Sequence, residues 1–341
     1  MIDKNNMLVT FIIIAYNAEK VLCNSLNCLK KQDYEHKDIE VILVDSNSDD
    51  NTREIMLDFK NKEKSFRTIK VLDNTKKILP AGWNVALKNS TGEAIVRVDA
   101  HSSFPDNFIS SNVKELNSGE NIVGGHRISI AQENNRWQNT LLIAEESVFG
   151  SGIATYRRKE DRRYVNTLAH AMYRKKVFDD VGRYNENLAR TEDNEMHYRM
   201  RKAGYKFLLS PNIISYHNAR NSLRGMIKQK YENGKWIGIT LKYCPKCFSV
   251  YHFVPLIFTL GMIFSIFIAC MGYPIFICLL IGIYLLFNII NLILTVIEYR
   301  FDIIYLLLPV ILFLLHISYG VGTIVGMIKG LFIKKEKLKN E

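Results

Sequence analysis

The chain has 341 residues, with 45 Lys and Arg against 34 Asp and Glu, which gives a formal net charge of +11. This length is enough for one large domain or two of medium size. The positive charge favours anionic partners such as phosphorylated substrates, lipid headgroups or nucleic acid. The sequence carries no zinc-finger or RNA-binding aromatic motif, so we expect no nucleic-acid partner.

Strand-like and helix-like segments alternate through the first half of the chain. The expected strands are short apolar runs, and the expected helices carry apolar residues at helical spacing. The strands cover 8–15, 39–44, 68–72 and 94–98, and the helices cover 21–29, 52–60, 81–88 and 105–116. Asn17 is expected to cap the first helix. This β-α-β-α order predicts an α/β fold with a mostly parallel, doubly wound sheet.

Three of the expected strands end on a polar residue. Asn17, Asp45 and Asp99 follow the first, second and fourth strand. In open parallel sheets, ligands bind beyond the carboxyl ends of the strands, so these side chains are expected to converge on a ligand. The alternative is that each acid only caps the helix that follows it.

The region after the expected sheet contains one clear helix. It covers 192–203 and ends at Gly204, and its first turn carries Glu192, Asp193 and Glu195. A carboxylate at a helix N-terminus stays ionised, which suits a general base. The helix dipole also lowers its basicity, and we expect repulsion from Glu192 and Glu195 to offset this. The alternative is an acidic turn that only caps the helix.

Beyond residue 250 the sequence becomes apolar. The runs 253–271, 274–297 and 303–327 are each close to the roughly 20 residues that cross a bilayer. Three spans would place the basic end of the chain outside, against the positive-inside tendency, whereas two spans or a re-entrant hairpin would keep it inside.

These patterns divide the chain into three parts. We expect a catalytic domain at 1–245, a membrane region of two or three spans at 251–333, and a basic tail at 334–341. The N-terminus lacks the architecture of a signal peptide, so the domain is expected to face the cytoplasm, with the chain multi-pass in the cell membrane.

The sequence also lacks the common phosphate-binding loops. There is no G-x-x-x-x-G-K-[ST] motif, and no G-x-G-x-x-G follows the first strand. Acidic strand ends repel phosphate unless a divalent cation lies between them. Asp99 and His101 can face one cation that bridges a diphosphate, and His217 is a third candidate ligand, although it could also be structural.

A basic and aromatic stretch follows His217. Arg220 and Lys235 are candidates for contacts with phosphate oxygens. Trp236 could stack on a sugar face, or lie at a membrane interface, where tryptophan is enriched.

Several of these stretches occur together in a known family. Ile-Ile-Ala-Tyr-Asn at 13–17, Val-Asp-Ser-Asn-Ser-Asp-Asp-Asn-Thr at 44–52, Asp-Ala-His at 99–101 and Glu-Asp at 192–193 have the order and intervals of GT-A-fold family 2 glycosyltransferases. Over roughly its first 240 residues the chain resembles this family. Pro-Ala-Gly-Trp-Asn at 80–84 and Arg-Val-Asp-Ala-His at 97–101 resemble bacterial exopolysaccharide enzymes of the succinoglycan-biosynthesis type.

The resemblance implies a nucleotide-binding role for several residues. Ala15, Asn17 and Asp45 would line the nucleoside pocket, with Asp45 near the uracil, and Asn84 would help to hold the nucleotide. Independently of the resemblance, Lys235 of the basic stretch is expected to bind the nucleotide-sugar.

The resemblance also implies the chemical roles. Asp99 and His101 would stand for the metal-binding D-x-D motif and hold Mn²⁺ or Mg²⁺, and Asp193 would be the catalytic base. The residues expected near the acceptor or donor sugar are Gly124, Gly125, Glu192 and Trp236.

The sequence departs from the family pattern at four places. Ala15 replaces a proline, Asn47 replaces the glycine of D-D-G-S, and His101 replaces the second metal-binding aspartate. The Q-x-x-R-W motif of processive synthases reads Glu-Asn-Gly-Lys-Trp at 232–236, which favours transfer of a single sugar.

The sequence therefore predicts a membrane-anchored, inverting glycosyltransferase. It would move one hexose from a UDP-sugar to a hydroxyl of a lipid-linked saccharide acceptor, in bacterial exopolysaccharide or cell-surface polysaccharide biosynthesis. One alternative is a polyprenyl-phosphate sugar transferase, and another is a non-catalytic membrane scaffold that keeps the fold. A small transporter or channel would explain only the apolar C-terminal region.

Overall fold

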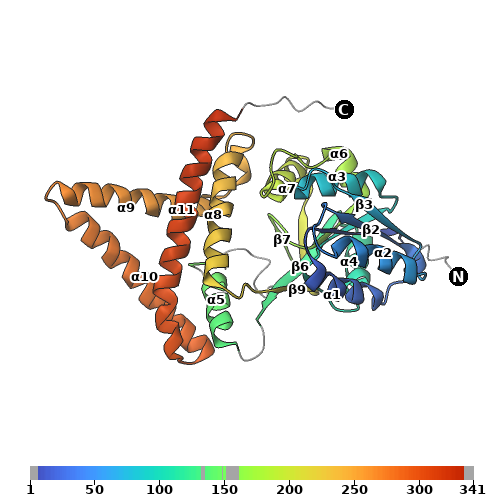
Figure 1. Cartoon of the computed structure of the whole chain (residues 1–341), viewed down its shortest axis with the longest axis horizontal. Helices are drawn as coiled ribbons and strands as arrows, with labels where there is room; N and C mark the ends of the chain where they lie inside the picture. Colours follow the sequence, from blue (N-terminus) through green and yellow to red (C-terminus); the bar gives the residue numbers. More distant parts are fainter. Residues whose placement is uncertain (1–6, 132–134, 148, 151–160, 334–341) are drawn as a thin grey trace. The chain divides into compact units, whose positions relative to one another are not determined.

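The structure is a computed structural model that describes residues 7–131, 135–147, 149–150 and 161–333 (Figure 1). The chain forms two compact units. The N-terminal unit comprises Met1–Ile130 and Ala154–Asn218, and the C-terminal unit comprises Ala131–Ile153 and Ala219–Glu341. Each unit is described separately below.

Within the described residues, nine strands of the N-terminal unit form one sheet. The strands are β1 (Val9–Ala15), β2 (Ile39–Asp45), β3 (Thr68–Asp73), β4 (Ala94–Asp99), β5 (Ser102–Ser103), β6 (Ile122–Ile130), β7 (Arg163–Val165), β8 (Ala171–Arg174) and β9 (Phe207–Asn218). Their order is β3-β2-β1-β4-β8-β6-β9-β5, with β7 paired to β9.

The first four strands are parallel, so their carboxyl ends lie along one edge of the sheet, where polar residues gather. Because β1 lies between β2 and β4, Ala15 pairs with Asp45, and Ile14 pairs with Asp99. Beyond β4 the sheet is mixed: β8 is antiparallel to both β4 and β6, and β9 runs parallel to β6. The expected α/β fold with a mostly parallel first half is therefore confirmed.

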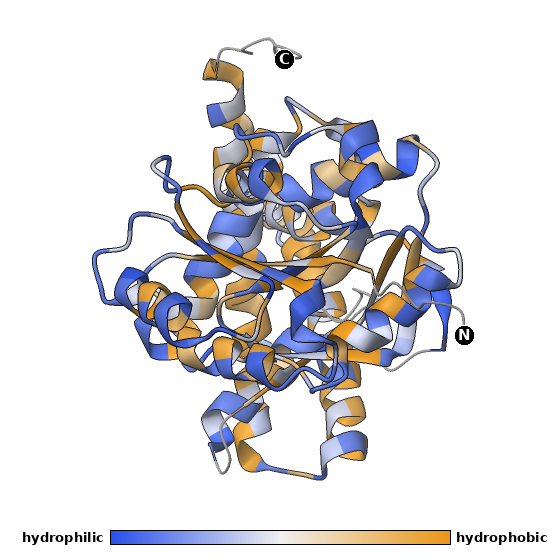
Figure 2. Cartoon of the chain, turned by 90° about the vertical axis from the view of Figure 1, so that its right-hand side faces the viewer, coloured by the Kyte–Doolittle hydropathy of each residue, from blue (hydrophilic) through white to orange (hydrophobic). Residues whose placement is uncertain are grey.

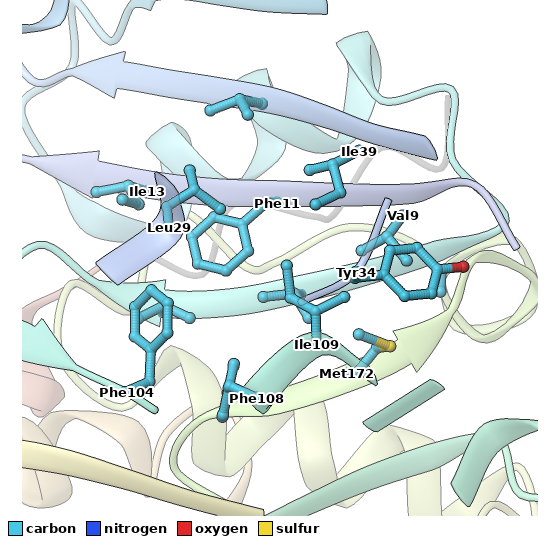
Figure 3. Close-up of a cluster of buried hydrophobic side chains, with 14 of the residues drawn as sticks. Val9, Phe11, Ile13, Leu29, Tyr34, Ile39, Phe104, Phe108, Ile109 and Met172 are labelled. Carbon is cyan, nitrogen blue, oxygen red and sulfur yellow. The ribbon is translucent and has the colours of Figure 1, made fainter. Parts of the chain in front are cut away.

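Helices cover both faces of this sheet. They are α1 (Glu19–Lys30), α2 (Thr52–Lys62), α3 (Leu79–Asn89), α4 (Phe108–Asn117), α6 (Lys175–Val181) and α7 (Glu192–Lys202). Side chains alternate across a strand, so Phe11 of β1 joins one buried cluster and Ile12 joins the other. Figure 3 shows the first cluster, where Phe11, Phe104 and Phe108 lie between the sheet and its helices. Figure 2 shows the strands mostly in the hydrophobic colour.

The start of α1 differs from the sequence expectation. Its N-cap residue is Ala18, and Asn17 adopts a positive φ of 48° instead of capping the helix. The first N–H groups of the helix bind residues far along the chain: Ala18 N donates to Thr52 Oγ1 at 2.7 Å, and Glu19 N donates to Asp50 Oδ2 at 3.1 Å. The predicted cap was therefore wrong, because side chains of a neighbouring loop satisfy this helix end.

The C-terminal unit is helical. It contains α5 (Arg136–Glu146), α8 (Leu223–Thr240), α9 (Val254–Cys270), α10 (Ile275–Tyr299) and α11 (Leu308–Phe332). In the described part of the chain, three helical segments are long and apolar enough to cross a membrane: Val250–Cys270, Ile275–Tyr299 and Ile303–Phe332. They correspond to the three apolar runs expected from the sequence.

Helix α8 packs closely on α11 through glycines from both helices. A Cβ atom added at Gly234 would lie 2.0 Å from the carbonyl oxygen of Tyr319, and one at Gly322 would lie 2.1 Å from that of Tyr231. The two backbones therefore approach as they do at small-residue crossings of membrane helices. The boundaries expected at 1–245 and 251–333 rest on composition and stay a prediction. The expected basic tail, 334–341, lies outside the described residues.

Candidate functional site

The ends of β1 and β2 bring together the three residues expected at the nucleoside. Asp45 is buried and accepts from the backbone N–H of Ser48 at 3.3 Å. The side-chain oxygen of Asn17 accepts from Asp49 N at 2.8 Å, and Asn17 N donates to Ser48 Oγ at 3.0 Å. Ala15 pairs with Asp45 in register. These bonds hold the two strand-end loops together as one edge.

Asn84 of α3 is fully engaged with the segment before α7. Its amide nitrogen donates to Tyr184 O at 2.9 Å and to Glu186 Oε1 at 2.8 Å, and its oxygen accepts from Tyr184 N at 2.8 Å. Its evident role is to anchor the 184–186 segment. A contact between Asn84 and a nucleotide stays a prediction.

Asp99 ends β4 and is held by a buried histidine that the sequence reading missed. His170, next to β8, places its Nε2 atom 3.2 Å from Asp99 Oδ2. Desolvation disfavours ionisation, but the hydrogen bond from His170 and the nearby His101 and Arg97 hold the pKa of the Asp99 carboxyl well below its usual range. Asp99 is therefore an ionised carboxylate at the strand end.

His101 and His217 lie together beside Asp99, as the sequence predicted. Their rings meet edge to face with centroids 4.6 Å apart, because β5 pairs with β9 and sets Ser102 opposite His217. Burial, together with the charge of Arg127, lowers the pKa of His217 to about 3. Its imidazole is thus neutral at physiological pH, the form that binds metals.

The donor set at this strand end fits a divalent cation. It combines an ionised carboxylate, Asp99, with His217, whose buried Nδ1 atom has no hydrogen-bond partner in the part of the chain described. Within those residues, no three His, Cys, Asp or Glu side chains gather closely enough to hold an ion. A cation here would therefore take its other ligands from a substrate or from water.

The first residue of α7 is buried in an ion pair. Glu192 Oε1 lies 3.2 Å from Arg97 Nη2, and the guanidinium of Arg97 lies 5.0 Å from the ring centroid of Trp83 and 5.9 Å from that of Tyr184. Burial and the charge of Asp193 raise the pKa of Glu192 to about 8, although Arg97 opposes this. Burial thus favours the protonated form of Glu192, whereas the pair with Arg97 favours the ionised form.

Asp193 follows at the same helix end and is only half-buried. Its Oδ1 atom accepts from Asn194 N at 2.8 Å. Of its neighbours in this turn, Glu192 is paired with Arg97 at 3.2 Å and Glu195 with Arg199 at 2.7 Å. Among the described residues Asp193 itself forms no ion pair, and the repulsion expected from the two neighbouring acids stays a prediction.

The adjacent glycines of β6 have a clear packing role. A Cβ atom at Gly125 would lie 1.7 Å from Ile213 O, and one at Gly124 would lie 2.7 Å from His170 O. Close approach of neighbouring strands therefore requires glycine at both positions. Their expected contact with a sugar stays a prediction.

Lys235 and Trp236 belong to α8, and Arg220 precedes this helix. All three residues are part of the C-terminal unit. Lys235 Nζ is paired with Glu232 at 2.8 Å, and Trp236 is half-buried. Their expected contacts with phosphate and sugar stay predictions.

Arg97 and His170 are the main residues that sequence reasoning missed. Arg97 stands within the Arg-Val-Asp-Ala-His stretch, and a charged residue inside a buried strand was a usable signal. His170 lies 71 residues after Asp99, in an irregular region, and only the folded sheet brings the two together.

Comparison with known proteins places the chain in a family. The profile of glycosyl transferase family 2 matches residues 10–182. The chain is 25% identical over 328 residues to a dolichyl N-acetyl-alpha-D-glucosaminyl phosphate 3-beta-D-2,3-diacetamido-2,3-dideoxy-beta-D-glucuronosyltransferase of Methanococcus voltae, which covers 94% of this chain and 98% of the relative. It is 26% identical over 200 residues to the succinoglycan biosynthesis protein ExoA of Rhizobium meliloti. This match covers 57% of this chain and 58% of the relative.

The fold also matches a solved glycosyltransferase. The mannosyltransferase PcManGT of Pyrobaculum calidifontis, solved with GDP-Man and Mn²⁺, superposes with a TM-score of 0.62 at 16% identity, over 97% of this chain and 89% of that one. The predicted GT-A fold and the predicted resemblance are thus confirmed. The chain belongs to glycosyl transferase family 2 and is a glycosyltransferase.

Proposed function

We propose that the chain transfers one hexose from a UDP-sugar to a hydroxyl of a lipid-linked saccharide, with inversion at the anomeric carbon. The observation that carries this proposal is the ionised Asp99 carboxylate at the end of β4, beside the neutral imidazole of His217. A carboxylate in this position would repel a diphosphate, unless it binds the diphosphate through a cation.

Asp99 would hold Mn²⁺ or Mg²⁺, and His101 and His217 are the candidates for a further ligand. A cation there would stabilise the negative charge of the departing UDP as a Lewis acid. The structure of PcManGT with GDP-Man and Mn²⁺ supports this part of the proposal. Asp45, Ala15 and Asn17 would contact the nucleoside from the joined strand-end loops, with Asn84 as a further contact.

Asp193 would act as the general base. Its carboxylate takes the proton of the acceptor hydroxyl, the hydroxyl oxygen forms a bond to C1 of the donor, and the bond between C1 and the phosphate oxygen breaks on the opposite face. The half-buried position of Asp193 leaves it accessible to an acceptor, whereas Glu192 is buried against Arg97. Gly124, Gly125 and Glu192 are the residues that we propose to lie near the two sugars.

The acceptor and the location follow from the apolar helices and the relatives. The name of the Methanococcus voltae relative contains a lipid-linked sugar phosphate, and that of the Rhizobium meliloti relative contains succinoglycan biosynthesis. The segments that could cross a membrane would keep the enzyme at the surface where such lipids lie. We therefore place the chain in the cell membrane as a multi-pass protein, with its N-terminal unit in the cytoplasm.

The test is the Asp193→Asn variant of the full chain. Sugar transfer should fall by about 10²–10⁴-fold, while UDP binding measured by calorimetry stays near the wild-type value. Glu195→Gln is the matched control, because it removes a carboxylate of the same helical turn that is already paired with Arg199. Loss of UDP binding together with transfer would assign Asp193 a structural role. A mild loss of transfer would favour a phosphate acceptor, which needs no strong base.

A further inference from the structure

His170 is the most completely buried ionisable side chain beside the proposed cation site. Its side chain is 1% exposed, whereas that of Asp99 is 29% exposed. A side chain so enclosed does not reach a substrate, so any effect of His170 on the reaction passes through Asp99. The inference below therefore rests on the proposed function and concerns how Asp99 is held.

The hydrogen bonds around His170 define its orientation. Nε2 lies 3.2 Å from Asp99 Oδ2, and Nδ1 lies 2.8 Å from Ser215 Oγ in β9. An ionised carboxylate only accepts hydrogen bonds, so the proton stands on Nε2. The hydrogen bond between Nδ1 and the hydroxyl of Ser215 holds the other side of the ring. Ser215 thus fixes the plane of the imidazole.

The turn after Asp99 is also held by a residue of α1. Ser25 of α1 places its hydroxyl 2.9 Å from Ala100 O and 2.5 Å from Ser102 O. Ser102 Oγ in turn lies 3.1 Å from His170 Nε2. Backbone and side chain at the end of β4 are therefore both restrained, and the side chain of Asp99 is restrained through one of its two oxygens.

We propose that His170 is a positioning residue for Asp99. By donating to Oδ2 it holds the carboxylate in one orientation and leaves Oδ1 as the oxygen available to a cation. No hydrogen bond to Oδ1 is present among the residues that the structure describes. Partners of this kind orient metal-binding carboxylates, and their loss typically weakens metal binding about 10–100-fold.

Two substitutions of His170 separate the effect of its hydrogen bond to Asp99 from the effect of losing the imidazole ring. In His170→Gln the amide nitrogen occupies about the place of Nε2 and can still donate to Asp99. In His170→Asn the shorter amide reaches only toward Ser215. Ser215→Ala is a milder third variant that removes the hydroxyl on which the ring orientation depends.

His197→Asn is the matched control. His197 is also buried, but its ring nitrogens contact Thr167 and Tyr173, which are not proposed ligands. It reports what the loss of a buried histidine does to the fold alone. Thermal unfolding of each variant shows that it is folded.

The experiment measures the binding of Mn²⁺ to the full chain in the presence of UDP. Calorimetry gives the affinity, and the electron paramagnetic resonance spectrum of Mn²⁺ reports on its surroundings. We expect His170→Asn to weaken Mn²⁺ binding about 10–100-fold, His170→Gln to stay close to wild type, and Ser215→Ala to fall between them. His197→Asn should bind as the wild type does. If neither substitution at 170 folds, Ser215→Ala decides by the same criterion.

Two failures can be told apart. Equal Mn²⁺ affinity in the wild type, His170→Asn and Ser215→Ala would overturn the role of His170 and leave the cation site standing. Absence of Mn²⁺ or Mg²⁺ binding by the wild type would overturn the cation site itself, and the role of His170 with it.

Discussion

The two units of the chain differ in how far their apolar side chains are exposed. In the N-terminal unit Phe11, Ile12 and Trp83 are at most 2% exposed, as in the core of a water-soluble domain. In the C-terminal unit Leu286 is 57% exposed, whereas Asn288, two positions further along α10, is 2% exposed. The first unit thus has an apolar interior, whereas α10 of the second unit exposes apolar side chains and buries polar ones, although α5, α8 and α11 also share a buried apolar cluster.

This contrast shows which surroundings each unit is built for. Polar side chains inside an apolar helix bundle find partners there, and apolar side chains outside it suit lipid. The sheet of the N-terminal unit instead gathers its polar groups at the strand ends, where chemistry is possible. We therefore expect substitutions in the first unit to act on sugar transfer, and substitutions in the second to act on membrane association.

The largest effect should come from removing divalent cations. With EDTA, sugar transfer should fall to background, because the carboxylates at the strand ends would repel the diphosphate, and added Mn²⁺ or Mg²⁺ should restore it. Membrane association, measured by flotation with vesicles, should not change. Sugar transfer at the wild-type rate in EDTA would contradict the proposal that the N-terminal unit catalyses transfer through a bound cation.

The second prediction compares a lysine substitution at an exposed leucine of each unit. Leu286→Lys, in the middle of α10, should disfavour membrane insertion by about 2.5–3.5 kcal/mol, since it places a charge among lipid chains. Leu57→Lys, on the exposed face of α2 in the N-terminal unit, should change stability by less than about 0.5 kcal/mol. Insertion assays and thermal unfolding in nanodiscs measure the two. Equal effects would mean that both units face water.

The third effect tests the close approach of α8 and α11. Gly322→Leu should destabilise the C-terminal unit by about 1–3 kcal/mol or more, because the side chain meets the backbone of α8. Gly282→Leu is its control, since a Cβ atom at Gly282 meets nothing within 4 Å. Unfolding in detergent compares them, and similar stabilities would argue against the tight crossing.

The smallest expected effect is a dependence of the unfolding free energy on pH, and it comes from Glu192. Burial raises the pKa of Glu192 from 4.5 to about 8 in the folded chain, so its stabilising protonated form is fully present below pH 4.5 and is lost as the pH rises through 8. Glu192→Gln should therefore gain stability relative to the wild type between these values, by at most about 1.4 kcal/mol per pH unit. Chemical unfolding at several pH values checks it. A difference that stays constant with pH would show that Arg97 keeps Glu192 ionised.

The sequence predicted most of what is local. The apolar runs of β1 to β4 and the helices between them were found within a few residues, because each is a pattern of burial along one segment. Asp45, Asp99 and Asn17 were placed at one edge by the rule for parallel strands, and the structure brings Ala15, Asn17 and Asp45 together. His101 and His217 were grouped correctly as well.

The rest depends on contacts between distant segments. Thr52 and Asp50 satisfy the start of α1, and His170 holds Asp99 from 71 residues away. The buried pair of Arg97 and Glu192 joins β4 to the start of α7, and no local pattern shows this. The joining of α8 to α11 likewise needs glycines from two helices that are far apart in the sequence.

The most direct test of the central claim is a crystal structure of the full chain with UDP and Mn²⁺, with the ion located by its anomalous scattering. The account predicts one Mn²⁺ ion in coordination with Asp99 and with the diphosphate of UDP, with the nucleoside against Asp45. An ion far from Asp99 and His101, or a diphosphate bound without any cation, would contradict it.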